Sequence, residues 1–384
     1  MANTNQRATP LELPELLHRF STLIFLYLLS GLVFLIWYRY QLNPDAVSYL
    51  DVAHGWATLD GRLIWNTYWS PLLPMLTAPL LLLGLPGIVA AKLVSLLGGV
   101  LVLWVLWQIA ALAELSPLMR LAVILGAGVL CIECAMLQTT PDVWAAGAVL
   151  LLLYLLVRPV STNWRREALL IALALALCYF TKLYLLYFAL VALPVVWGLR
   201  QRSFGWLTRR LFWRQAAGGY GLGLLLCALW FVPLSVQHGA FTLGEAGEFN
   251  YALVMARGRQ FPMATEGILP PKPGHTSAWT DITQHSYPEA WPQSTGALIA
   301  QQAKVVGDNL LVLAKIIGKQ LYVLLLIPIG FLFWYKRTGV FRSTLGMLLV
   351  LFVVYVAGYV FVIVEQRYLL PAVLVALLLA AKGV

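Results

Sequence analysis

Long apolar runs recur along the chain, and they limit its fold more than any other feature. The first run, residues 20–40, has about the 20 residues that a helix needs to cross a bilayer. Of the 384 residues, 61% are hydrophobic and only 11% are charged, which excludes an ordinary soluble domain. These observations predict an all-α polytopic membrane protein.

We expect a bundle of about ten membrane-spanning helices that form one transmembrane domain over residues 1–384, with no C-terminal soluble domain. The expected helices occupy residues 20–40, 86–113, 119–138, 142–158, 167–180, 183–199, 215–236, 309–335, 343–364 and 367–382. The run at 71–84 is short and is flanked by prolines, so we expect it to lie at the surface or to re-enter.

If the run at 71–84 does not cross, the basic clusters near residues 158–166, 200–214 and 336–342 all fall on one side. The positive-inside rule makes that side cytoplasmic. The N-terminus, with Arg7 and Arg19 before the first run, is then cytoplasmic too. The formal charge of +10 is explained as a topology signal, and no nucleic-acid partner is expected.

Two segments are expected on the extracytoplasmic face of a bacterial-type inner or plasma membrane. Residues 41–85 form a first external loop whose mixture of polar and aromatic side chains predicts interfacial helices. Residues 237–305 form a large external loop without clear helical or strand periodicity, which predicts an ordered loop held by its aromatic side chains.

Four ionisable residues lie at the expected outer ends of helices. Asp45 follows the first helix, and Asp142 begins another helix after Pro141. Lys182 lies at the apex of a tight hairpin, and Arg367 begins the last helix. Two carboxylates and two cations beside the bilayer predict a site for an anionic, membrane-embedded substrate.

Each of these residues also has a purely structural interpretation. Asp45 would form a turn with its proline, and Asp142 would cap its helix through backbone N–H groups. Lys182 would extend its ammonium to the interface, and Arg367 would pair with Glu365 or anchor the last helix.

Further residues are candidates for contacts with a sugar or an acceptor. Glu133 lies in an apolar helix near its outer end, where a hydrogen bond inside the bundle and a role in the site are both open. The other candidates are aromatic or imidazole side chains near the expected outer face: Tyr49, Tyr368, Trp279, His285 and Trp291.

The motifs occur in a characteristic order. Pro44-Asp45 is followed by Tyr49-Leu50, then by Ser70-Pro71, by Thr140-Pro141-Asp142, by Thr181-Lys182 and by Arg367-Tyr368. This order resembles the GT-C superfamily of integral-membrane glycosyltransferases, such as lipid A aminoarabinose transferases and protein O-mannosyltransferases. The resemblance covers residues about 20 to 382.

The resemblance implies a polyprenyl-phosphate sugar donor, used on the extracytoplasmic face in cell-envelope glycosylation with inversion at the anomeric carbon. The acceptor class, a lipid, a glycan or a protein, stays open. Asp45 matches the aspartate taken as the catalytic base, and Asp142 matches a second site carboxylate. Lys182 and Arg367 match residues near the lipid phosphate.

The chain also departs from the family pattern. Ala46 follows Asp45 where many relatives have a glutamate, and Trp69 precedes Ser70-Pro71 where many relatives have a lysine before two prolines. Metal use therefore stays open, and Asp45 and Asp142 would hold a divalent metal ion if one takes part.

The residues support a transfer reaction in their own right. An acceptor hydroxyl needs a carboxylate to take its proton, and we assign that role to Asp45. Lys182 and Arg367 would stabilise the departing phosphate. The alternative is a transporter or flippase of a lipid-linked sugar or other amphiphile, which would bind its cargo without chemistry. The clustering of ionisable residues on one face and the lack of a visible internal repeat favour the transferase.

Overall fold

The computed structural model describes residues 13–255, 280–281, 294–319 and 344–383. Within these ranges the regular structure is helical and no strand occurs. The predicted all-α fold is therefore confirmed.

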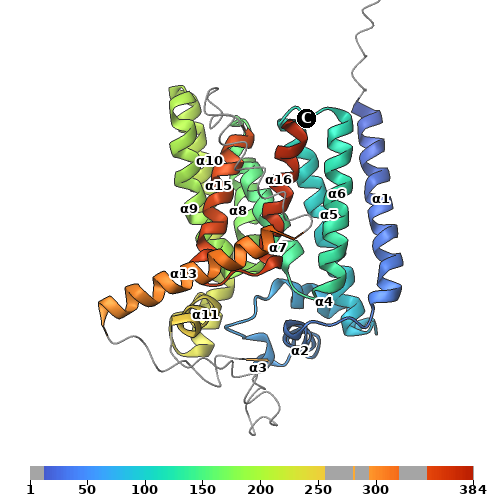
Figure 1. Cartoon of the computed structure of the whole chain (residues 1–384), viewed down its shortest axis with the longest axis vertical. Helices are drawn as coiled ribbons and strands as arrows, with labels where there is room; N and C mark the ends of the chain where they lie inside the picture. Colours follow the sequence, from blue (N-terminus) through green and yellow to red (C-terminus); the bar gives the residue numbers. More distant parts are fainter. Residues whose placement is uncertain (1–12, 256–279, 282–293, 320–343, 384) are drawn as a thin grey trace, which may run out of the picture.

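The long helices run side by side as a bundle (Figure 1). They are α1 (Leu13–Tyr38), α5 (Gly87–Leu112), α6 (Pro117–Leu137), α7 (Asp142–Val157), α8 (Trp164–Thr181), α9 (Leu183–Arg200), α10 (Trp206–His238), α15 (Thr344–Val360) and α16 (Leu370–Gly383). Five described helical stretches, in α1, α5, α6, α9 and α10, are long and apolar enough to cross a membrane. Helices α7 and α15 are apolar but shorter, and the helix expected at 309–335 lies partly outside the described residues.

Helix α7 lies at the centre of the bundle. Nearly all of its residues are buried, because α5, α8, α9 and α16 pack around it. Its first residue is Asp142, so the central helix begins at a candidate site residue.

Short helices gather at the lower end of the bundle in Figure 1. They are α2 (Pro44–Thr58), α3 (Gly61–Ile64), α4 (Leu72–Leu82) and α11 (Ala246–Met255). Helix α4 has 11 residues and is therefore about 16 Å long, too short for the hydrocarbon core. The helices expected in the first loop are present, whereas the side of the membrane on which they lie stays a prediction.

The segment 237–305 contains regular structure that its sequence did not indicate, because helix α11 and the start of α13 (Thr295–Ile317) both lie in it. Phe249 and Leu253 of α11 are buried in a cluster with Tyr49 and Trp69, so tertiary packing stabilises this short helix. Helix α13 begins early because the Ser294 side chain accepts a hydrogen bond from the Ala297 amide at 3.2 Å.

The hairpin predicted over 167–199 is present. Helices α8 and α9 are joined at Lys182, whose extended backbone (φ −156°, ψ 130°) reverses the chain. Helix α10 packs closely against α8, because a side chain at Gly219 would place its Cβ 2.7 Å from Ile171. This close contact supports the helix that carries Lys182 at its end.

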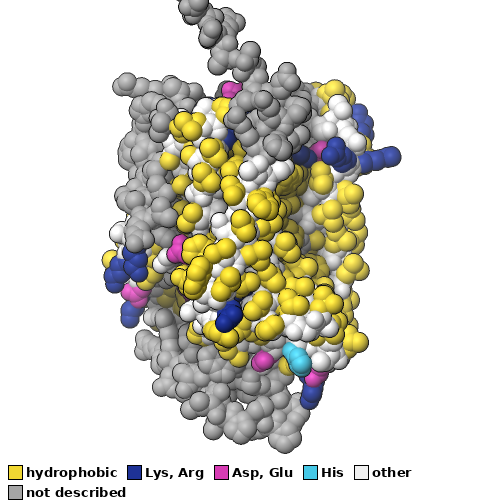
Figure 2. Space-filling view, turned by 90° about the vertical axis from the view of Figure 1, so that its right-hand side faces the viewer, with side chains coloured by type: hydrophobic (Ala, Val, Ile, Leu, Met, Phe, Trp, Pro, Cys, Tyr) yellow, Lys and Arg dark blue, Asp and Glu magenta, His cyan; other side chains and the backbone are white. Residues whose placement is uncertain are grey.

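Apolar side chains cover much of the face of the bundle that Figure 2 shows. On α1, for example, Phe25 and Trp37 are 64% and 69% exposed. Figure 2 shows few charged side chains in the middle of this face and more of them toward its two ends. Exposed apolar surface of this extent belongs in lipid, so the chain is an integral membrane protein.

Candidate active site

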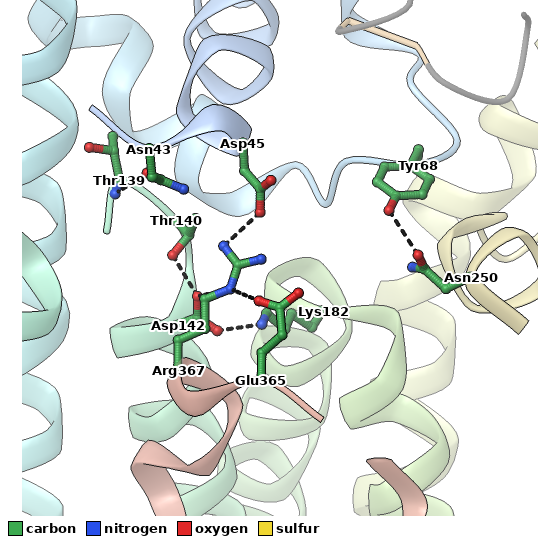
Figure 3. A network of polar contacts seen from close by, with 10 residues as sticks. All are labelled: Asn43, Asp45, Tyr68, Thr139, Thr140, Asp142, Lys182, Asn250, Glu365 and Arg367. Carbon is green, nitrogen blue, oxygen red and sulfur yellow. Dashed lines mark hydrogen bonds and ion pairs between the residues drawn. The ribbon is translucent and has the colours of Figure 1, made fainter. Parts of the chain in front are cut away.

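Asp45, Asp142, Lys182 and Arg367 meet at the end of the bundle where the short helices α2–α4 gather, and Figure 3 shows them from close by. Each comes from a different segment: the start of α2, the start of α7, the α8–α9 connection and the short 3-10 helix η4 (Gln366–Leu369). The structure thus brings together all four ionisable residues that the sequence singled out.

The start of α2 is tied to the connection before α7. Asn43 precedes α2, and its side-chain oxygen accepts a hydrogen bond from the Thr139 amide at 2.8 Å. Pro44 fills the first position of α2, where a missing N–H costs nothing. Asp45 is thereby held close to Asp142, although 97 positions separate them in the sequence.

Arg367 is the centre of the site. Its Nη1 lies 2.6 Å from Asp45 Oδ2, and its Nε donates to Glu365 Oε2 at 2.6 Å. Asp142 Oδ2 is farther away, 3.9 Å from Nε. Burial alone would lower the pKa of Arg367, but Asp142, Glu365 and Asp45 outweigh it, so the pKa is raised. The guanidinium is therefore always charged.

Asp142 and Lys182 form an ion pair at the side of Arg367 (Figure 3). The Asp142 side chain is 2% exposed, and its second oxygen accepts a hydrogen bond from the Thr140 hydroxyl. The cap position before α7 is Pro141, which makes no side-chain cap. The carboxylate thus contacts neighbouring segments through its side chain, and helix capping does not account for it.

Tyr368 lies under both cations. Lys182 Nζ is 4.1 Å from the centre of its ring and Arg367 Cζ is 5.3 Å from it, distances typical of cation–π contacts. The ring also stacks on Tyr359, with ring centres 4.9 Å apart. Tyr368 is therefore positioned to hold the cations in place.

Tyr49 lies one turn after Asp45 in α2, with its ring edge-on to Trp69 at 5.0 Å. Burial, followed by the charges of Asp45 and Asp142, raises the pKa of Tyr49. Its hydroxyl therefore keeps its proton at the pH of the cell.

Glu133 does not join the cluster. It is exposed on α6, and no hydrogen bond or ion pair of its side chain occurs within the described residues. The candidates Trp279, His285 and Trp291 lie outside the described residues. The neighbouring Thr280 is described: its hydroxyl donates to Asp51 of α2 at 2.8 Å.

Two residues of the site were not among the candidates predicted from the sequence. Glu365 binds the guanidinium, and its position two residues before Arg367 was the available signal. Asn43, just before the proline, holds the two halves of the site together. Nothing in the sequence points to its partner Thr139.

A small surface hollow lies next to the α8–α9 connection. It is lined by Leu183, which follows Lys182, and by the aromatic side chains of Tyr68, Trp69, Tyr179 and Trp230. The Trp230 ring also contacts Trp65 at 5.1 Å between ring centres. The hollow thus offers aromatic surface close to the charged residues.

The described residues do not fit a metal site. No group of three or more His, Cys, Asp or Glu side chains converges among them. Asp45 is bound by Arg367, and both oxygens of Asp142 are taken by Lys182 and Thr140. A metal ion would have to displace these partners.

No protein-family model matches the chain, and no curated protein sequence matches it. Among solved structures, the chain is similar to ArnT from Cupriavidus metallidurans in the apo state. The two share 17% sequence identity with a TM-score of 0.44, over 94% of this chain and 77% of the other.

Proposed function

We propose that the chain is a membrane glycosyltransferase of the GT-C type. It would move a sugar from a polyprenyl-phosphate donor to a hydroxyl of a lipid, glycan or protein acceptor, on the extracytoplasmic face. The observation that carries the proposal is the meeting of Asp45, Asp142, Lys182 and Arg367 at one end of the bundle.

Lys182 and Arg367 suit a phosphate that stays in the membrane surface. Their side chains are 17% and 15% exposed, so both are partly shielded from water and still reachable. Arg367 can grip two phosphate oxygens with its fork, whereas Lys182 acts as a point charge. Fixed cations in a poorly hydrated site stabilise the negative charge that grows on a departing phosphate.

Asp45 is the general base of the proposed reaction. The acceptor O–H bond breaks and its proton passes to the Asp45 carboxylate, while the acceptor oxygen bonds to the anomeric carbon. The bond from that carbon to the phosphate oxygen breaks, and its electron pair leaves with the polyprenyl phosphate. Attack from the face opposite the phosphate inverts the anomeric carbon. A phosphate leaves without being protonated, so no strong acid is needed.

Asp142 has a supporting role in this scheme. Because it is bound to Lys182 and is almost fully buried, it cannot readily reach an acceptor hydroxyl. Its charge instead keeps Lys182 at the α8–α9 turn, facing the Tyr368 ring. The aromatic side chains around the hollow beside Trp230 would offer flat apolar faces to a sugar at the surface.

The proposal is tested with purified protein in lipid and a panel of polyprenyl-phosphate sugars, together with a membrane extract as the source of acceptors. Release of free polyprenyl phosphate by the wild type and its loss in Asp45→Asn would support the transferase. The donor that is consumed would identify the sugar.

The same preparation distinguishes transfer from transport. A flippase would move a labelled lipid between leaflets without changing it chemically. In that case neither the wild type nor Asp45→Asn would cleave the donor. Binding that weakens when Lys182 or Arg367 is replaced, without turnover of any donor, would contradict the proposed chemistry.

A further inference from the structure

The Arg367 guanidinium is held at two different edges by two carboxylates. Glu365 accepts from Nε, while Asp45 contacts Nη1 (Figure 3). Within the described residues, no partner of Nη2 occurs. The Nη1–Nη2 edge of the guanidinium can donate two parallel hydrogen bonds. In the described residues only one of its two nitrogens, Nη1, contacts a carboxylate.

We infer that Glu365 is a positioning residue, which anchors Arg367 through Nε while the Nη edge exchanges Asp45 for the donor phosphate. The exchange frees Asp45 to take the acceptor's proton only after the donor is bound. This inference rests on the proposed function and adds an order of events to it.

The net charge of the site requires one carboxylate to separate from its cation when a phosphate binds. Three carboxylates (Asp45, Asp142 and Glu365) face two cations (Lys182 and Arg367), so an arriving phosphate adds negative charge to a site that already carries an excess. Like charges placed side by side without a cation between them are costly in a site of low dielectric. One carboxylate must therefore give up its cation.

Asp45 is the carboxylate best placed to do so. Asp142 is 2% exposed and is held by Lys182 and Thr140 together. Glu365 shares the segment of Arg367, two residues away, so its contact needs little chain ordering. Asp45 comes from the separate helix α2 and, among the described residues, has Arg367 as its ion-pair partner.

Two phosphate oxygens match the Nη1–Nη2 edge, since a guanidinium donates two parallel N–H bonds to such a group. The anchoring bond from Nε to Glu365 is on another edge and can stay in place throughout. The guanidinium then needs no large movement, and the carboxylate of Asp45 is released where the acceptor arrives.

The exchange is tested by binding of farnesyl phosphate, a short prenyl phosphate, to the full-length protein in nanodiscs by calorimetry. Asp45→Asn removes the competitor for Arg367, so we expect binding at least about threefold tighter. Glu365→Gln removes the anchor, so we expect binding at least about threefold weaker. General electrostatics alone predicts tighter binding for both, because each variant removes one negative charge.

Glu114→Gln is the matched control, since Glu114 is exposed in the α5–α6 connection at the opposite end of the bundle. It should leave binding unchanged. Glu365→Asp keeps a carboxylate and should recover part of the affinity, which distinguishes anchoring from a folding defect in Glu365→Gln.

Tighter binding by Glu365→Gln, or unchanged or weaker binding by Asp45→Asn, would overturn the exchange. If binding still depended on Lys182 and Arg367 in that case, the proposed phosphate site would stand. If the wild type did not bind farnesyl phosphate at all, the exchange and the phosphate site would both be overturned.

Discussion

Substitutions of Asp142 and Lys182, which form an ion pair, should have strongly coupled effects on the free energy of unfolding. Asp142→Asn leaves Lys182 without its carboxylate, and breaking a buried pair costs about 3–5 kcal/mol. Because Lys182 is 17% exposed and keeps the Tyr368 ring, we expect the lower limit, about 3 kcal/mol. Lys182→Met should cost less, about 2 kcal/mol, since Asp142 keeps Thr140 and lies 3.9 Å from Arg367.

The double variant Asp142→Asn/Lys182→Met removes both charges and should cost about 3 kcal/mol, which gives a coupling of about 2 kcal/mol. Equilibrium unfolding in mixed micelles measures all four proteins, with the fluorescence of the 15 tryptophans as the signal. A coupling below about 0.5 kcal/mol would refute the reasoning, because the two charges would then not stabilise each other.

Three further predictions concern packing, a buried lysine and metal use. Gly219→Ala should lower the free energy of unfolding by about 1–3 kcal/mol, since its Cβ would meet Ile171 at 2.7 Å, whereas Gly221→Ala, with open space, should not. Lys92 is fully buried and donates to the Met136 carbonyl, so in the same unfolding assay Lys92→Met should cost about 1 kcal/mol and the cavity-forming Lys92→Ala about 3 kcal/mol. EDTA should leave donor cleavage unchanged, because the side chains of Lys182 and Arg367 already neutralise Asp142 and Asp45 without a metal ion. Cleavage that EDTA abolishes and a divalent metal restores would contradict this prediction.

The positions of the site residues were predictable because the ends of apolar runs mark the ends of helices. Counting the predicted membrane crossings between them then puts Asp45, Asp142, Lys182 and Arg367 on the same side of the membrane. The structure brings these four residues together. The partners within the cluster were not predictable in the same way. Arg367 meets both Asp45 and Glu365, and that choice depends on how α2 is held by Asn43 against the α6–α7 connection.

The place of Glu133 and the presence of helix α11 were not predictable from the sequence, for a common physical reason. Glu133 lies in a helix that is apolar around most of its circumference, so the sequence does not reveal which side faces the bundle. Helix α11 depends on contacts with Tyr49 and Trp69, which are far away in the sequence. In both cases tertiary packing decides the outcome and local periodicity does not.

The pairing of the charges also links assembly of the bundle to formation of the site. Lys182 and Arg367 could not be buried beside the bilayer as single cations without a large cost in free energy. Their carboxylates come from α2, from α7 and from the segment before η4, so neutralisation requires these segments to pack first. A change that leaves a cation without a carboxylate, such as Asp142→Asn, should therefore disturb folding and catalysis together. A variant that removes a cation together with its carboxylate, such as Asp142→Asn/Lys182→Met, separates the effect on folding from the effect on catalysis. Arg367 keeps Asp45 and Glu365 as partners in that variant.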